Sequence, residues 1–331
     1  RLTQNINALF FNTYFKEVYK KIKNKDKLIF VADKYYSNFP FDTMVINNPE
    51  MNTNNIDIID HNIKPRYLVQ DFEISYLPNI ETFVQVSSNN KINISKNSKF
   101  LGIGDPILKL QSKKEKKITE VKFLRTGNIE DTNSIFSNYD ELPFTKDELT
   151  EMSKIFAKSN LLIGKDADEK KIKNLDLTDY DVISFATHAE VFGNFSEYNE
   201  PFLVLSPPKN STIENDGLLT TSELSELNLD SDLVILSACN TSSKKDEYAE
   251  GYSGLVASFF SAGARSIIST YWPVEDKAGY ILMTKTIEKS VNDQMSISEA
   301  LKKTKIEFIE GKYGEEYKKP FYWAPYVYLG L

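Results

Sequence analysis

Cysteine and histidine are almost absent from this chain of 331 residues, which contains one cysteine and two histidines. The single cysteine, Cys239, cannot form a disulfide within the chain, so the sequence favours a reducing compartment and a cytoplasmic protein. A structural zinc site generally needs four Cys or His ligands, and we expect neither a metal nor a cofactor. Any chemistry that requires a thiolate or an imidazole therefore depends on Cys239, His61 or His188.

Long apolar runs and an excess of positive charge are also missing. No stretch approaches the roughly 20 consecutive apolar residues of a membrane helix, and the first 15 residues lack the successive regions of a signal peptide. The formal net charge of -7 argues against general binding to nucleic acid, which needs a basic surface. We therefore expect no membrane association and no direct contact with nucleic acid.

Short apolar runs of strand length recur along the chain and alternate with helical patterns. The runs lie at 28–32, 100–106, 181–187, 201–206, 232–238 and 265–270, and the helical patterns at 5–24, 144–157, 251–263, 275–290 and 296–310. This alternation predicts an α/β fold, an α/β/α sandwich with a mainly parallel central sheet. Residues 67–86 are predicted to be extended. Thr145, with Glu148 three residues later, predicts a capping box at a helix start.

His188 and Cys239 each follow directly after one of these apolar runs. In open α/β sheets the binding crevice lies beyond the carboxyl ends of the strands. If the two strands are neighbours, an imidazole and a thiol face each other, although 51 positions separate them. An imidazole can take the proton of a thiol that is mostly protonated at neutral pH. A lone cysteine is more often an inert buried residue, and that alternative stays open here. His61 is interpreted as a surface residue.

The segments around this pair resemble the CHAT domain, a caspase-like module that often follows tetratricopeptide repeats. The histidine motif is DVISFATHAEV (181–191) and the cysteine motif is DLVILSACNT (232–241). Further segments match in the same order: FPFDTMV (39–45), YLVQDFEISYLPNIETF (67–83), FLGIGDP (100–106), DGLLTTSEL (216–224), EGYSGLVASFFSAGARSIISTYWPVED (250–276) and FYWAPYVYLG (321–330). The resemblance therefore runs along nearly the whole chain.

The resemblance implies a caspase-like fold and a cysteine endopeptidase that cleaves a protein substrate through a thioester acyl-enzyme. Carried over onto this sequence, Cys239 is the nucleophile and His188 is the general base and acid. The backbone N–H groups of Ala189 and Cys239 are expected to hold the oxyanion. Many caspase-like enzymes have glycine directly after the histidine, where this chain has Ala189.

The substrate-binding residues are predicted to follow the nucleophile. Tyr271 and Trp272 are expected to line one wall of the cleft. The sequence WPVED, which begins at Trp272, resembles a tryptophan-valine-aspartate segment of separases. That resemblance implies an Arg or Lys at P1, held by Asp276 with Glu275 as a lesser contributor. The alternative is that Asp276 caps the helix that follows.

Two regions are predicted along the chain. Residues 1–26 are expected to be a helical lead-in, the end of an upstream repeat region, and residues 27–331 the CHAT protease domain. The resemblance also implies a regulatory partner that acts through this missing repeat region, and a bacterial protein of antiviral defence. Two alternatives stay open: a catalytically silent caspase-like module that binds proteins, and an amidase that uses the same pair on a small molecule.

Overall fold

The structure is a computed structural model that describes residues 2–31, 39–47, 64–87, 92–108, 136, 138–190, 200–212, 214–237, 239–240 and 253–331. Within these ranges the strands form an eight-stranded central sheet and a smaller four-stranded sheet. The central sheet contains, in spatial order, β1 (Lys27–Val31), β2 (Glu73–Leu77), β12 (Tyr326–Leu329), β11 (Ile267–Thr270), β9 (Leu233–Leu236), β5 (Val182–Ala186), β3 (Lys99–Gly104) and β4 (Lys158–Ile163).

The central sheet is mainly parallel, which confirms the prediction. Strands β11, β9, β5, β3 and β4 all run in one direction. Strand β12 pairs antiparallel with β11, and β2 and β1 then continue parallel to β12. Strands β5 and β9 are buried along their whole length, and for this reason their sequences are apolar except for Ser184 in β5.

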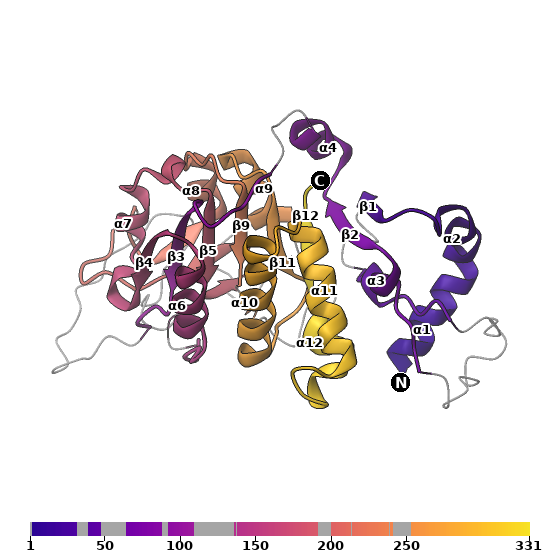
Figure 1. Ribbon diagram of the computed structural model, residues 1–331. Helices are drawn as coiled ribbons and strands as arrows, with labels where there is room; N and C mark the ends of the chain where they lie inside the picture. Colours follow the sequence, from indigo (N-terminus) through magenta and orange to yellow (C-terminus); the bar gives the residue numbers. More distant parts are fainter. Residues whose placement is uncertain are drawn as a thin grey trace.

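Helices cover both faces of this sheet. The crossover β3-α6-β4 and the crossover β9-α9-β11 run along the sheet in opposite directions, so right-handed connections place α6 and α9 on opposite faces. Figure 1 shows α6, α10 and α11 side by side, and α8 packs against α9. The helices of these layers are α6 (Thr145–Ile155), α7 (Glu169–Lys173), α8 (Thr221–Glu226), α9 (Ser253–Ala262), α10 (Asp276–Asn292) and α11 (Ile297–Glu310). The predicted α/β/α sandwich is therefore confirmed.

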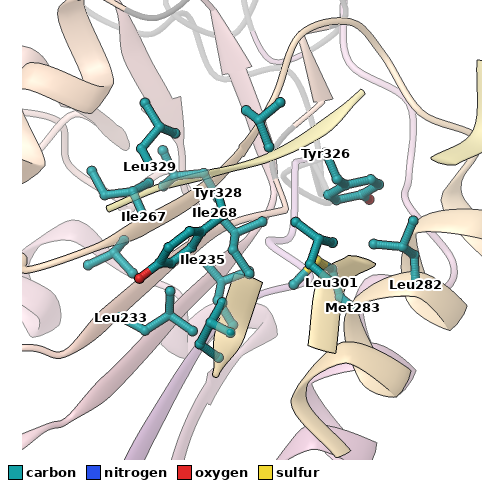
Figure 2. Close-up of a cluster of buried hydrophobic side chains, with 14 of the residues drawn as sticks. Leu233, Ile235, Ile267, Ile268, Leu282, Met283, Leu301, Tyr326, Tyr328 and Leu329 are labelled. Atoms are coloured by element: carbon teal, nitrogen blue, oxygen red, sulfur yellow. The ribbon is translucent and has the colours of Figure 1, made fainter. Parts of the chain in front are cut away.

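Apolar side chains of β9, β11 and β12 meet those of α10 and α11 in the core. Figure 2 shows Ile268 and Tyr326 from the sheet beside Leu282, Met283 and Leu301 from the two helices. Each of these five side chains is at most 2% exposed. Complete burial of an apolar side chain stabilises a fold by about 1.5–3 kcal/mol. The strands that lead to the candidate site are thus held firmly in place.

The smaller sheet extends from the carboxyl ends of β5 and β9. Its strands, in spatial order, are β10 (Cys239–Asn240), β6 (His188–Glu190), β7 (Phe202–Val204) and β8 (Leu218–Thr220). The apolar run at 201–206 forms β7 in this sheet, antiparallel to both neighbours, and not a strand of the central sheet. Behind it lies a separate apolar cluster that includes Phe136, Tyr139 and Phe202.

Two local predictions differ from the structure, and one strand was missed. The segment 67–86 is not extended throughout, because it contains α3 (Leu68–Asp71), β2 and α4 (Ile80–Ser87). The capping box of Thr145 and Glu148 does not form: the N-cap of α6 is Phe144, without a side-chain hydrogen bond, and Thr145 Oγ1 donates to a backbone carbonyl. Glu148 is buried instead, because its helix face packs on the sheet. Strand β4 was not predicted.

The N-terminal segment is helical over α1 (Leu2–Phe10), a π-helical stretch (Phe11–Phe15) and α2 (Lys16–Ile22). Asn7 Nδ2 donates to the Thr43 side chain (2.5 Å) in the short helix η2 (Phe41–Thr43). The remaining short helices are η3 (Gly164–Asp166), η4 (Leu177–Asp179), η5 (Glu316–Lys318) and α12 (Pro320–Trp323). None of the helices in the described ranges has both the length and the apolar character that a bilayer crossing requires. The boundary at residue 26 stays a prediction.

A buried ion pair lies where η2 meets α11. Lys305 Nζ is 2.7 Å from Asp42 Oδ1, and the two side chains are 1% and 3% exposed. The Tyr76 hydroxyl donates to the second oxygen of Asp42 (2.6 Å), and Lys305 also donates to the Tyr326 carbonyl (2.5 Å). Both charges are therefore paired and hydrogen-bonded, as buried charges must be.

Candidate active site

The carboxyl ends of β5 and β9 bring two parts of the chain together. These strands are parallel neighbours, with Phe185 aligned to Leu236 at their ends, so the expected adjacency of the strands is confirmed. Immediately beyond them, β6 and β10 pair in parallel, and Cys239 is aligned with His188. Backbones of neighbouring strands lie about 4.8 Å apart. The register therefore places the two predicted catalytic positions directly beside each other.

The imidazole of His188 is buried and held from one side. Its Nε2 is 2.7 Å from the carbonyl oxygen of Asp140, and its ring centroid is 5.0 Å from that of Tyr139. Because a carbonyl can only accept a hydrogen bond, Nε2 must carry the proton in this contact. The other nitrogen, Nδ1, is then the basic one in the neutral ring. It is buried and has no hydrogen-bond partner among the described residues.

Burial also tunes the protonation of this ring. His188 is 2% exposed. Removal from water lowers the pKa of His188 below its usual 6.5, and the carbonyl of Asp140 opposes this only in part. The ring is therefore neutral at pH 7, with an unprotonated Nδ1 that can accept a proton. This is the state that a general base requires.

Ala189, the predicted oxyanion residue, lies in the middle strand of the small sheet. It is 3% exposed and is aligned with Asn240 on one side and with Leu203 on the other. It therefore adjoins both predicted catalytic positions. The assignment of its backbone N–H to the oxyanion stays a prediction.

The predicted substrate-binding residues follow β11, which is the neighbour of β9 in the sheet. Tyr271 and Trp272 are half-buried, and their rings stack with centroids 6.3 Å apart. Trp272 Nε1 donates to the carbonyl of Phe321 (3.2 Å). These two aromatic residues thus form one continuous surface beyond the end of β11, and their contact with a substrate stays a prediction.

The two acidic residues of the predicted P1 site both contact backbone N–H groups. Glu275, not Asp276, is the N-cap of α10, and its carboxylate accepts from the N–H of Ala278 (2.8 Å). Asp276 Oδ2 accepts from the N–H of Phe144 (2.7 Å) at the start of α6. Burial raises the pKa of Asp276. The first turns of α6 and α10 are therefore tied together at this edge of the sheet.

A third acidic residue, Glu148, lies at the same edge and was not among the predicted site residues. It is 3% exposed, and its Oε2 accepts a hydrogen bond from the hydroxyl of Ser237 (3.1 Å), two residues before Cys239. Burial raises the pKa of Glu148 to about 8, and the charge of Asp276 adds to this effect. Glu148 is thus largely protonated at pH 7.

Replacement of Glu148 by glutamine is expected to stabilise the protein at about pH 8 and to change its stability little at about pH 4. Between its usual pKa of 4.5 and its folded pKa of about 8, the unfolded chain ionises Glu148 while the folded chain keeps it protonated. The free energy of unfolding therefore decreases as the pH rises through this window, by at most about 1.4 kcal/mol per pH unit. Urea unfolding of both proteins across this range measures the effect. Identical pH profiles of the two proteins contradict this assignment.

No group of three or more His, Cys, Asp or Glu side chains in the described part of the chain is arranged to hold a metal ion. Sequence reasoning missed three site features: the Asp140 carbonyl, the Tyr139 ring and the Glu148 carboxyl. The first has no sequence signal, because every residue has a carbonyl. Glu148 did give a signal, since it is an acidic residue on a helix face that packs on the sheet.

Comparison with known proteins identifies one matching family and solved structures with a similar fold. The profile of the CHAT domain family matches residues 4–331. No curated protein matches the sequence significantly. Among solved structures, separase in the Saccharomyces cerevisiae separase–securin complex is similar, with 14% identity, a TM-score of 0.44, and coverage of 79% of this chain and 14% of the separase chain. The Arg-specific cysteine proteinase gingipain R has 11% identity, a TM-score of 0.46, and coverage of 97% of this chain and 66% of its own.

Proposed function

This chain belongs to the CHAT domain family, and on that premise we propose that it is a cysteine endopeptidase with Cys239 and His188 as its catalytic pair. The observation that carries the proposal is the register of β6 and β10, which aligns the backbone of Cys239 with that of His188. The unpaired Nδ1 of a neutral His188 supports it, because the general base of such a pair must have a nitrogen free to accept a proton.

In the proposed reaction, Nδ1 of His188 takes the proton of the Cys239 thiol, and the thiolate attacks the carbonyl carbon of the scissile peptide bond. The Nε2–H group stays bonded to the carbonyl of Asp140, which orients the ring and stabilises its positive charge. The backbone N–H groups of Ala189 and Cys239 would stabilise the oxyanion. The imidazolium then protonates the leaving amine, and water hydrolyses the thioester to release the acid.

The substrate in this proposal is a protein segment in extended form. It would lie along Tyr271 and Trp272, with an Arg or Lys at P1 directed towards Asp276 and Glu275. From the family resemblance we further propose a regulatory partner that acts through a region upstream of residues 1–26, and a role in bacterial antiviral defence in the cytoplasm. The proposals about the regulatory partner, the defence role and the cellular location do not depend on the chemistry of Cys239 and His188.

The proposed function is tested by peptide cleavage with the nucleophile removed. The wild-type protein is expected to cut members of a proteome-derived peptide library, and Cys239→Ser to lose at least about 10³-fold of this activity, because the hydroxyl is a far weaker nucleophile. An electrophilic peptide probe should label Cys239 in the wild type. Labelling without cleavage of any peptide would identify a silent binding module, and cleavage of only small amides would identify an amidase.

A further inference from the structure

Glu148 contacts Ser237 just beyond the carboxyl end of β9 and lies near Asp276 in the first turn of α10, and Glu275 precedes Asp276 as the N-cap of that helix. Glu275 and Asp276 each accept a hydrogen bond from a backbone N–H. Glu148 differs, because only its Oε2 is engaged, by the hydroxyl of Ser237. Its Oε1 is buried and has no hydrogen-bond partner among the described residues. The cluster therefore contains a buried carboxyl oxygen that makes no hydrogen bond within the described part of the fold.

The buried Oε1 of Glu148, which has no hydrogen-bond partner among the described residues, lowers the stability of the fold. A buried polar atom without a partner destabilises a protein, because it has lost its hydrogen bonds to water. The carboxyl of Glu148 remains uncharged for this reason, and burial raises its pKa to about 8. A leucine or methionine at the same position of α6 would pack on the sheet without that cost. An unsatisfied buried acid beside a proposed active site indicates a functional group that awaits a ligand.

The chemistry of the cluster selects a cation as that ligand. The charge of Asp276 disfavours ionisation of Glu148 in the empty site. A positive group beside Glu148 reverses this balance, because it attracts both carboxylates. A neutral donor would satisfy Oε1 but would not favour its ionisation. Ser237 is two residues before Cys239, so their Cα atoms are at most about 7 Å apart. The long side chain of a lysine or an arginine can span such a distance.

We propose that Glu148 is a specificity-determining residue that receives the cationic end of an arginine or lysine side chain at P1, the residue on the amino side of the cleaved bond. The inference rests on the proposed protease function and assigns the selective contact to Glu148 in addition to Asp276. Because Glu148 is buried in this structure, the proposal requires that the first turns of α6 and α10 separate and that the Phe144 N–H leaves Asp276. Glu148 then releases its proton to solvent and pairs with the ligand.

The test compares peptidyl acyloxymethyl ketones that share all positions except P1, which is arginine, lysine, citrulline, leucine or aspartate. Citrulline has the shape of arginine without its charge. The arginine probe is expected to label wild-type Cys239 at least about 30-fold faster than the citrulline probe. In Glu148→Gln this ratio is expected to fall below about threefold. Both rates come from one protein, so a general change in fold or in thiol reactivity cancels in the ratio.

Asp276→Asn is the matched variant, since it removes the neighbouring charge and leaves Glu148 in place. It is expected to lower the ratio less than Glu148→Gln does. A ratio that survives in Glu148→Gln overturns the inference, and so does a wild-type preference for citrulline, leucine or aspartate. If the proposed protease function is wrong, the result is different: no probe labels Cys239 in any variant. That result also overturns the inference about Glu148.

Discussion

Replacement of His188 by alanine is expected to lower kcat/KM for peptide cleavage by about 10²–10⁴-fold. In the proposed mechanism, the proton of the Cys239 thiol passes to Nδ1 of His188, which is the basic nitrogen because Nε2 is bonded to the Asp140 carbonyl at 2.7 Å. Without the imidazole, the reaction depends on the small fraction of thiolate that is present at neutral pH, and the leaving amine has no proton donor. Steady-state kinetics on a peptide that the wild type cleaves measures the loss.

The pH profile distinguishes this role from a structural one. Because burial lowers the pKa of His188, the acid limb of kcat/KM in the wild type is expected below pH 6.5. In His188→Ala the limb should move up towards the ionisation of a free thiol, at about pH 8.5. His61→Ala is the matched control, since it removes the other histidine and should leave rate and profile unchanged. A wild-type limb near pH 8.5, or a loss of less than about tenfold in His188→Ala, contradicts the assignment.

The strands of the central sheet could be predicted because complete burial leaves a clear mark on the sequence. A strand that is covered on both faces is a nearly continuous apolar run, as in β9 and in β5, where Ser184 is the one polar residue. The edge strand β4 was missed because only its last four residues are partly buried and its start is exposed. The run at 201–206 is just as apolar as the core strands. Its partners are β6 and β8, and nothing within the run itself specifies them.

Two Thr-x-x-Glu sequences, each at the start of a helix, show where local patterns stop being informative. Thr220 and Glu223 form a complete capping box at the start of α8, with reciprocal side-chain hydrogen bonds. Thr145 and Glu148 have the same spacing and form none. The difference is tertiary, since the first turn of α6 packs against the end of β9, where Ser237 binds the Glu148 carboxyl. Burial against a strand far away in the sequence has overridden a pattern that is normally reliable.

The adjacency of the Cys239 and His188 positions could be predicted from chain topology, whereas the contacts that hold the His188 ring could not. Each residue follows a buried strand, and carboxyl ends of parallel neighbours meet at one edge of a sheet. The register that aligns Cys239 with His188 follows from that adjacency. The carbonyl of Asp140 comes from a segment 48 positions before His188. The position of this carbonyl beside His188 depends on how the neighbouring Tyr139 packs in the second apolar cluster. No spacing in the sequence reveals that packing.

Asp42→Asn is expected to lower the free energy of unfolding by about 3–5 kcal/mol, because it leaves the ammonium of Lys305 buried without a counter-charge. The two side chains are at most 3% exposed, so water cannot replace the lost carboxylate. Urea unfolding measures the loss. Glu151→Gln is the control, since its ion pair with Lys154 is largely exposed and its removal should cost less than about 0.5 kcal/mol.

The double variant Asp42→Asn/Lys305→Met separates the charge from the packing. Removal of both charges is expected to recover more than half of the loss, because a buried pair that is replaced by uncharged side chains of similar size often costs little. The pair lies beneath β12, where Lys305 donates to the carbonyl of Tyr326 and Tyr326 is aligned with Thr270 at the end of β11. It therefore supports the strand end from which Tyr271 continues. A double variant as unstable as Asp42→Asn contradicts the ion-pair account and assigns the loss to the hydrogen bond between Asp42 and Tyr76.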